Sequence, residues 1–123
     1  EGRTYAWGDQ RDKMRGNMPD TRLRKAAPIG VFPEGDTPRG IADLIGNGGE
    51  WTSSAHGTDP KNPLYRYPYD PTDGREEPDT EDAMNRVIRG PAWVGMELAF
   101  AWWREECEPG LRYAHNTFRV VAG

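Results

Sequence analysis

Residues 86–121 have the sequence RVIRGPAWVGMELAFAWWREECEPGLRYAHNTFRVV, and they contain three of the five Trp and two of the three Phe of the chain. Polar and apolar residues alternate at both ends of this stretch, over 85–90 and 117–121, which predicts two short strands. We expect these strands to pair or to neighbour one another in one small sheet. The residues between them then form a long excursion, and this is where we expect the function to lie.

The composition indicates one folded, loop-rich domain. A chain of 123 residues is long enough for one core. The hydrophobic fraction is 35%, the mean hydropathy is -0.92, and the 15 Gly and 11 Pro favour turns over regular elements. The five Trp, five Tyr and three Phe supply large buriable side chains, which disordered segments usually lack. We therefore predict a compact fold with many loops.

The charge and the single cysteine exclude several classes of protein. A net charge of -4 argues against nucleic-acid binding, and we interpret the basic residues of 1–25 and the acidic residues of 70–82 as solvated loops. With only Cys107 the chain forms no internal disulfide, which predicts a reducing compartment such as the bacterial cytoplasm. No apolar run resembles a signal peptide or a membrane span. Because the chain begins at Glu1 rather than Met, a removed leader or a longer parent protein stays open.

A glycine-rich segment, GNGGEWT at 46–52, has the composition of a cation loop. Three Gly in four positions allow a backbone path that turns carbonyl groups toward one point. Asp43 and Glu50 flank that path with the carboxylates that a hard cation needs. The alternative is a tight turn with Trp51 in the core and both acids exposed. Asn17 and Asp20 pose the same choice, between oxygen ligands and an Asx turn.

The long polar segment 53–81 carries five Pro and predicts an irregular excursion, which in a compact domain is usually functional or flexible. Tyr65, Tyr67 and Tyr69 alternate with a period of two, so they could pack one aromatic edge against the body of the domain. We interpret His56 as an exposed loop residue, because no second metal ligand lies at a suitable spacing. Near the start of the chain, Tyr5 and Trp7 are expected to anchor the first loop on the core.

Six pieces of the chain together carry a resemblance to a known family. They are YAWGD at 5–9, PIGVFP at 28–33, DLIGNGGEWTS at 43–53, RVIRGPAW at 86–93, Arg104, and FRVV at 118–121. In this order and spacing the chain resembles the C-terminal half of the formylglycine-generating-enzyme and sulfatase-modifying-factor superfamily. The resemblance implies an α+β fold of the C-type-lectin-like kind, loop-rich and with a small antiparallel sheet.

The chain departs from the family pattern in two places. The N-terminal portion of the family is missing, so we interpret residues 1–123 as a single domain that is a shortened version or the C-terminal part of a longer protein. Gly48 and Gly49 also stand where the family commonly has a small residue followed by Trp, which thins the packing at that turn.

The resemblance implies structural calcium. Carried over residue by residue, it places side-chain oxygens of Asp43 and Glu50 and the carbonyls of Gly46 and Gly48 on one ion. A second family site draws on Asn17, the carbonyl of Met18 and Asp20.

The resemblance also bears on catalysis. Enzymes of the family oxidise a substrate thiol with two cysteines that hold copper, and the matching positions here are Met96 and Ala101. Cys107 alone cannot form a two-cysteine site. The related iron-dependent sulfoxide synthases take their histidines mainly from another domain. We therefore predict a non-catalytic binding module; a thiol-oxidising enzyme or its degenerate relative, and a structural appendage of a larger protein, are the alternatives.

The centre of the opening stretch predicts a binding surface. By propensity 97–107 could form a helix, but its family equivalent is extended chain and loop, and we follow the family. Neighbouring residues of an extended chain point to opposite sides, so Trp102 and Trp103 cannot both face the core. At least one is then expected near the surface, where large aromatic side chains are typical interaction anchors.

A branch of the family makes this prediction more specific. Variable proteins of diversity-generating retroelements use the same scaffold and vary residues between the motifs RGGSW and GFRVV, often at positions encoded as Asn in the template. The residues in the corresponding intervals that arise by changing adenines of an Asn codon are Val94, Gly95, Leu111, Tyr113, Ala114 and His115. Met96 and Trp102 do not arise from that codon so simply. The alternative is that Tyr113 and His115 only cover a loop.

These arguments predict a calcium-stabilised recognition module for a protein or another macromolecular ligand, attached to the remainder of a parent chain. We expect neither nucleic acid nor membrane as partner, and the fold name does not imply sugar binding. The predicted binding face consists of Val94, Gly95, Met96, Phe100, Trp102, Trp103, Glu105, Leu111, Tyr113, Ala114 and His115.

Overall fold

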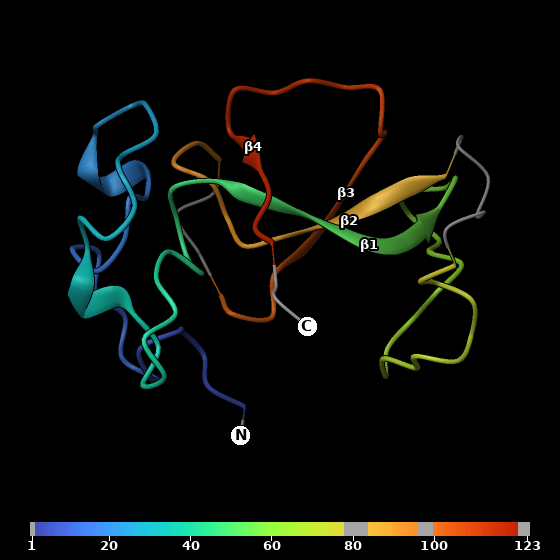
Figure 1. The fold of residues 1–123 in the computed structure, drawn as a ribbon, viewed down its shortest axis with the longest axis horizontal. Coiled ribbons are helices and arrows are strands. Elements are labelled where there is room, and N and C mark those ends of the chain that lie inside the picture. The colour runs from blue at the N-terminus through green and yellow to red at the C-terminus, as the bar shows by residue number, and fades with distance from the viewer. Residues whose placement is uncertain (1, 78–83, 96–99, 121–123) are drawn as a thin grey trace.

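The computed structural model describes residues 2–77, 84–95 and 100–120. Two short 3-10 helices and four strands lie within these residues (Figure 1): η1 (Pro19–Thr21), η2 (Pro33–Gly35), β1 (Gly49–Gly57), β2 (Asn85–Arg89), β3 (Arg104–Cys107) and β4 (Asn116–Thr117). Proline opens both 3-10 helices, where its fixed φ fits and its missing N–H costs nothing. The predicted loop-rich fold with one small sheet is confirmed.

The strands form one mixed sheet in the order β3-β2-β1-β4. β2 pairs antiparallel with both β1 and β3, whereas β4 pairs with β1 in parallel, with Gly49 opposite Asn116. The two strands predicted at the ends of the opening stretch therefore share one sheet, but β1 lies between them. The sheet is also not the wholly antiparallel one that the sequence predicts, because β4 runs in the same direction as β1. Of the predicted strand 117–121, β4 includes only Thr117, and residue 121 lies outside the described residues.

β1 is the element that the sequence pattern does not reveal. Its residues, GEWTSSAHG, are polar and lack an apolar alternation, so they do not have the composition of a central strand. β1 is a strand because its backbone hydrogen-bonds to β2 on one side and to β4 on the other, although its composition does not predict a strand. The glycine turn is real at Gly46 and Asn47, which have φ of 86° and 68°, but the strand begins two residues later. Trp51 is half-buried in it.

The prediction that His56 is an exposed loop residue is wrong. His56 lies in β1 and is only 7% exposed. Its backbone oxygen accepts a hydrogen bond from the Leu64 N–H at 2.9 Å, so the chain that follows β1 folds back over the strand. Burial, together with the nearby Arg104 charge, lowers the pKa of its imidazole.

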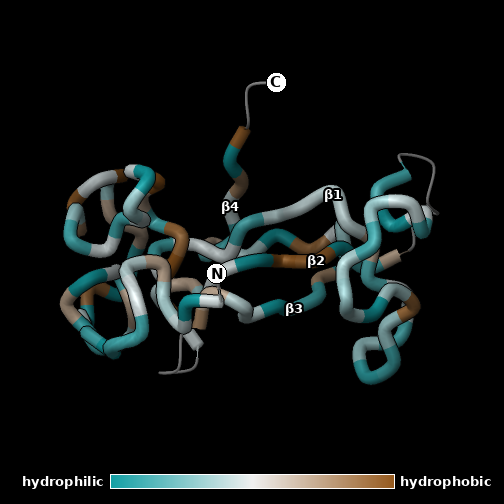
Figure 2. Tube along the Cα trace, turned by 90° about the horizontal axis from the view of Figure 1, so that it is seen from below, coloured by the Kyte–Doolittle hydropathy of each residue, from teal (hydrophilic) through white to brown (hydrophobic). Residues whose placement is uncertain are grey.

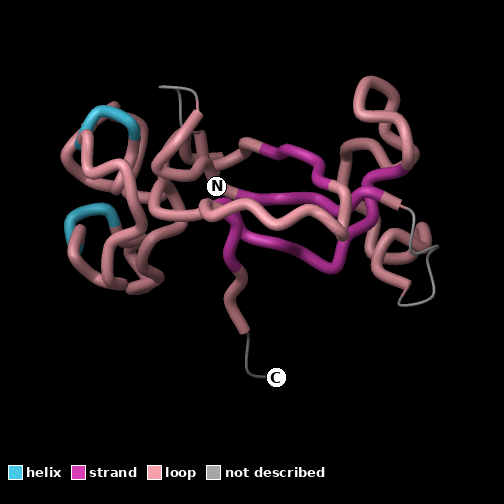
Figure 3. Tube along the Cα trace, turned by 90° about the horizontal axis from the view of Figure 1, so that it is seen from above, coloured by secondary structure: helices cyan, strands magenta, loops and turns pink. Residues whose placement is uncertain are grey.

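One cluster of buried side chains comes from the loops before β1, and further buried residues, among them Ala55, Val87 and Ile88, lie in β1 and β2. The cluster consists of Tyr5, Ala6, Met18 and Ile45. The ring of Tyr5 stacks on that of Trp7, with centroids 5.2 Å apart and planes 7° apart, which confirms that this pair anchors the first loop. Figure 2 shows hydrophobic residues concentrated in the middle of β2, and Figure 3 shows the strands crossing between groups of loops at the two ends of the molecule.

The polar excursion after β1 packs around one buried arginine. Arg75 is 2% exposed, and its guanidinium donates to Asp73 at 2.6 Å and to the Arg66 carbonyl at 3.0 Å. It also lies over the rings of Tyr65 and Tyr69, at 5.7 and 4.8 Å from their centroids. Residues 58–77, here called the 58–77 loop, are therefore organised by charge and aromatic contacts rather than by an apolar core.

Candidate ligand-binding groove

The sheet has two chemically different faces because side chains alternate along each strand. The register of β2 with β3 places Ile88 beside Glu105, and it places Arg89 beside Arg104. Paired residues share a face, whereas the neighbours Ile88 and Arg89 point to opposite faces. We call the side of Ile88 and Glu105 the groove face, and the side of Val87, Arg89 and Arg104 the arginine face.

Two adjoining cavities, here called together the groove, open on the groove face. They measure about 530 Å³ and about 230 Å³, and both are lined by Ile88, Glu105, His115 and Asn116. The groove brings together seven residues of the predicted binding face: Val94, Gly95, Trp103, Glu105, Leu111, Tyr113 and His115. These residues come from three separate segments of the chain, so the fold assembles them into one concave surface.

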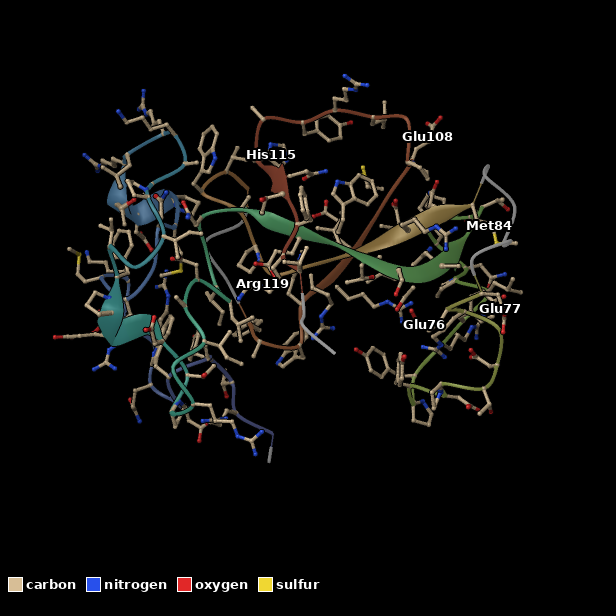
Figure 4. The ribbon with its side chains drawn as sticks, in the orientation of Figure 1. Glu76, Glu77, Met84, Glu108, His115 and Arg119 are labelled. Carbon is tan, nitrogen blue, oxygen red and sulfur yellow. The ribbon has the colours of Figure 1, made fainter. Side chains whose placement is uncertain are left out.

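His115 occupies the centre of this surface, immediately before β4 (Figure 4). Its ring stacks on Tyr113 with centroids 5.2 Å apart, and it meets Trp93 edge-on at 6.5 Å. Its backbone oxygen accepts the Gly49 N–H at 2.9 Å, which fixes the end of the loop to β1. His115 and Tyr113 thus form a stacked aromatic pair that lines the groove.

The wider end of the groove is acidic. Glu105, Glu106 and Glu108 line it, and burial raises the pKa of Glu106, with the Glu105 charge adding to the shift. Burial also raises the pKa of the Cys107 thiol, and the hydrogen bond that Asn116 donates to its sulfur at 3.7 Å only partly opposes this. A buried thiol with a raised pKa is a poor nucleophile at neutral pH.

Three described residues of the predicted binding face do not line the groove: Phe100, Trp102 and Ala114. Phe100 packs on the core, 5.9 Å from the ring of Tyr5, and stacks on Trp102 at 4.6 Å. Trp102 is 60% exposed whereas Trp103 is half-buried, which confirms that the two tryptophans do not both face the core. Ala114 is exposed beside the groove. Met96, like 97–99 of the segment predicted to be extended, lies outside the described residues.

The first predicted calcium loop already contains a cation, the guanidinium of Arg119. Asp43, Gly48 and Glu50 line one cavity of about 400 Å³ with Arg119. Arg119 Nε lies 2.8 Å from both carboxylate oxygens of Glu50, and its second nitrogen donates to the carbonyls of Ala42 and Asp43 at 3.1 and 3.3 Å. The predicted ligands, which are the carboxylates of Asp43 and Glu50 and the carbonyls of Gly46 and Gly48, are oxygen groups of the kind that calcium prefers.

Other contacts in that loop involve the remaining predicted ligands. The Asp43 carboxylate accepts the Gly30 N–H at 3.3 Å, and the Gly46 carbonyl accepts the Gly48 N–H at 2.8 Å. No three side chains of His, Cys, Asp or Glu converge anywhere in the described part of the chain. An ion in this loop would therefore depend on backbone carbonyls for much of its coordination.

The oxygens of the second predicted calcium site accept hydrogen bonds from Thr21. Its hydroxyl lies 3.1 Å from Asn17 Oδ1 and 2.8 Å from the Met18 carbonyl. Asn17 is fully buried, and its amide nitrogen donates to the Lys25 carbonyl at 2.9 Å and to the Asn47 side chain at 3.1 Å. Asn17 therefore links two loops, and calcium binding there stays a prediction. Asp20 pairs with Arg11 at 3.0 Å.

Comparison with known families shows to which family the chain belongs. The family described as sulfatase-modifying factor enzyme 1-like domain matches residues 1–123, the whole chain. The chain belongs to this family. No curated protein sequence matches the domain closely enough to count as a relative.

Among solved structures, the sulfatase-modifying-factor-type domain is similar to Treponema denticola variable protein 1. The TM-score is 0.63 and the sequence identity 18%, and the match covers 93% of this chain and 39% of that one. The domain thus spans well under half of that protein's length. At this identity the likeness shows the fold, and it confirms the C-type-lectin-like architecture of the variable-protein kind.

Sequence reasoning missed several residues that line the groove of this domain. Asn116, Glu106 and Glu108 line it but were not predicted. The signal was present for Asn116, which immediately follows His115. Glu106 lies in β3 and Glu108 just beyond it, so only the pairing of β3 with β2 brings these glutamates to the groove. Within the described residues, no helix has the length and apolar character needed to cross a membrane.

Proposed function

We propose that this domain is a non-catalytic recognition module that binds a protein or another macromolecular ligand in the groove. The observation that carries the proposal is that two cavities join at Ile88, Glu105 and His115 and are lined largely by residues of 94–115. Concave sites that combine aromatic side chains with a few polar groups are typical of ligand binding. Interface hot spots are likewise enriched in Trp and Tyr.

The charge of the groove favours a basic ligand segment. Glu105, Glu106 and Glu108 surround its wider end, and Tyr113 and His115 form an aromatic wall beside them. A peptide with an Arg or Lys next to an apolar side chain would satisfy both features, because carboxylates attract the cation and the rings cover the apolar part.

We further propose that the groove is diversified among sibling proteins. Five of the six positions compatible with a mutated Asn codon line it: 94, 95, 111, 113 and 115. In sibling sequences from one genome, substitutions should concentrate at these five positions and spare Ile88 and Asn116. Substitutions spread evenly along the chain would contradict diversification and leave the binding proposal to be judged by binding alone.

Panning a random peptide-display library against the immobilised domain tests the binding proposal. Selected peptides should be rich in Arg and Lys and should lose at least about tenfold in affinity for a Tyr113→Ala, His115→Ala double variant. Met14→Ala is the matched control, because Met14 is 66% exposed and does not line the groove. Equal loss with both variants, or none with either, would contradict binding in the groove.

The thiol-oxidising alternative has a direct test. Copper-loaded protein incubated with a cysteine-containing peptide should consume no oxygen above the rate of free copper. The buried Cys107, with its raised pKa, supports this expectation. Oxygen consumption that disappears in a Cys107→Ser variant would establish an enzyme instead.

We propose calcium as a structural ion at the first loop, held by the side chains of Asp43 and Glu50 and the carbonyls of Gly46 and Gly48. To bind there, calcium would take the Glu50 carboxylate from the Arg119 guanidinium, and it would then cross-link the 42–48 turn to the start of β1. A ligand present at a hundredfold excess over its dissociation constant stabilises by about 2.7 kcal/mol, so calcium should raise the unfolding temperature relative to EGTA. Asp43→Asn should abolish the rise and Asp59→Asn should not. An unchanged melting temperature in wild type would contradict the site.

A further inference from the structure

A second cavity, of about 300 Å³, lies on the arginine face of the sheet. The 58–77 loop closes one side of it and the strands close the other. Its lining residues are Thr52, Ser54, Tyr67, Tyr69, Arg75, Val87, Arg89 and Arg104. Since Val87 and Arg89 alternate with Ile88 along β2, the sheet itself separates this cavity from the groove.

Two of its three arginines lack a carboxylate partner among the described residues. Arg89 donates to the Tyr67 hydroxyl and to the Ala101 carbonyl, both at 2.9 Å. Arg104 donates to the Tyr65 carbonyl at 3.2 Å, and its Nε is buried with no hydrogen-bond partner. A buried donor left unsatisfied is costly, so Arg104 has hydrogen-bonding capacity that a ligand could use.

The neighbouring acids do not neutralise this positive charge. Asp73 is engaged by Arg75 through two nitrogens, and Glu76 accepts hydrogen bonds from Ser53, Ser54 and Tyr69 next to β1 (Figure 4). Three guanidinium groups line the cavity, and among the described residues no carboxylate does. Burial lowers the pKa of Arg104, and the charges of Arg75 and Arg89 add to this, whereas that of Tyr67 opposes it.

The side chains around the charge suit a flat organic body. The guanidinium of Arg104 lies over the ring of Tyr67 at 5.4 Å, and Tyr67 and Tyr69 are 61% and 53% exposed. Val87 provides an apolar floor. A cavity of this size falls at the lower end of small-molecule sites, and guanidinium groups match the planar geometry of a carboxylate.

We propose that the arginine face binds a small carboxylate-bearing ligand, with the carboxylate on Arg89 and Arg104 and its body along Tyr67, Tyr69 and Val87. A carboxylate can accept hydrogen bonds from both Arg89 and Arg104, which have no carboxylate partner among the described residues, whereas a phosphate dianion would meet stronger repulsion from Glu76. This site is independent of the groove on the other face, and neither proposal depends on the other.

Titration with benzoate, followed by amide NMR shifts of the ¹⁵N-labelled domain, tests the proposal. Benzoate should shift the amides of Tyr67 and Tyr69 and leave those of Leu111 and Tyr113 in place. Benzamide, which has the same shape without the charge, should bind at least about tenfold more weakly, since charge-assisted hydrogen bonds are lost. Benzoate shifts confined to the groove, or equal binding of both compounds, would overturn the proposal.

Two variants change the charge of the cavity in opposite directions. Arg89→Gln should weaken benzoate about tenfold, and Glu76→Gln should strengthen it about threefold, because it removes a nearby negative charge. Misfolding cannot increase affinity, so Glu76→Gln still tests the benzoate site if Arg89→Gln does not fold. Glu105→Gln, on the groove face, is the matched control and should change nothing. Weaker binding with Glu76→Gln, or inorganic phosphate binding more tightly than benzoate, would overturn the assignment.

Discussion

The two faces of the sheet carry opposite charges although the same two strands build both. In β2 and β3 the pair Ile88 and Glu105 opens onto the acidic groove, and the pair Arg89 and Arg104, one position away, lines the basic cavity. The alternation of a strand is enough to produce this separation. A small sheet of this kind can therefore support two unrelated binding sites without a second domain.

The faces also differ in what holds their loops. The 58–77 loop over the arginine face depends on the buried Arg75, whereas the 108–115 loop beside the groove is fixed at its end by the Gly49 to His115 backbone hydrogen bond. Side-chain substitutions should therefore damage the arginine face more readily than the groove. The effects on stability that we expect from this difference are given in order of decreasing size.

Arg75→Gln should lower the free energy of unfolding by about 2 kcal/mol, because it removes a buried guanidinium that donates to the exposed Asp73 and to the Arg66 carbonyl and lies over two tyrosine rings. Denaturant unfolding measures this loss. Arg66→Gln, an exposed change in the same loop, should cost less than about 0.5 kcal/mol. If both variants cost the same, the loop does not depend on the buried charge. In Arg75→Gln, amide shifts should change around β1 and 65–69 and remain in place at Tyr113.

Arg119→Gln should cost about 1 kcal/mol, since Arg119 forms a partly exposed bidentate pair with Glu50. The change should loosen the β4 edge of the sheet more than its centre, because Arg119 follows β4 and holds it to Glu50 at the start of β1. Amide hydrogen exchange should quicken at Asn116 and stay unchanged at Val87. Faster exchange at Val87 instead would mean that the pair supports the whole sheet rather than this edge.

Acidification should affect the contributions of Glu106 and Asp73 to stability in opposite directions. Burial, then the Glu105 charge, raises the folded pKa of Glu106, so its carboxyl favours the native state below its unfolded pKa and this contribution is lost as pH rises through the folded value. Arg75 lowers the folded pKa of Asp73, so that contribution is present above the unfolded pKa and is lost as pH falls through the folded value.

Carboxyl ¹³C titration measures both groups in one sample. Glu106 should titrate above an ordinary Glu and Asp73 below an ordinary Asp. Glu76 should also titrate low: burial opposes this, but hydrogen bonds from Ser53, Ser54 and Tyr69 outweigh it. Shifts of the same sign for Glu106 and Asp73 would contradict the assigned causes, which are burial at Glu106 and the hydrogen bond with Arg75 at Asp73. Glu106→Gln should raise stability at neutral pH by a few tenths of a kcal/mol.

The sequence predicts the fold through its motifs but not through every strand. The alternation of polar and apolar residues predicts β2, and the large aromatic side chains of Tyr5 and Trp7 predict that they anchor the first loop. β1 cannot be predicted from the sequence, because pairing with its neighbours rather than its composition makes it a strand. His56 was expected in a loop for the same reason, since it lies in this unpredicted strand.

The candidate site was predictable as an interval of the chain but not as a surface. Val94, Tyr113 and His115 meet only through the sheet, which no local pattern encodes. Phe100, a residue of the predicted binding face, packs beside Tyr5 and does not line the groove, and this contact with the start of the chain has no signal in the local sequence. The arginine face depends on residues of 58–77 reaching Arg89 and Arg104, a contact between distant segments that spacing does not reveal.

The order of the strands has a consequence for engineering. β3 and β4 are the two outer strands, so the 108–115 loop leaves the sheet at one edge and returns at the other (Figure 1). Lengthening it changes the neighbours of no strand, and surface loops tolerate insertions when their ends stay fixed. A foreign epitope grafted between Glu108 and Tyr113 would be displayed above an intact sheet, which makes the domain a candidate carrier for peptide presentation.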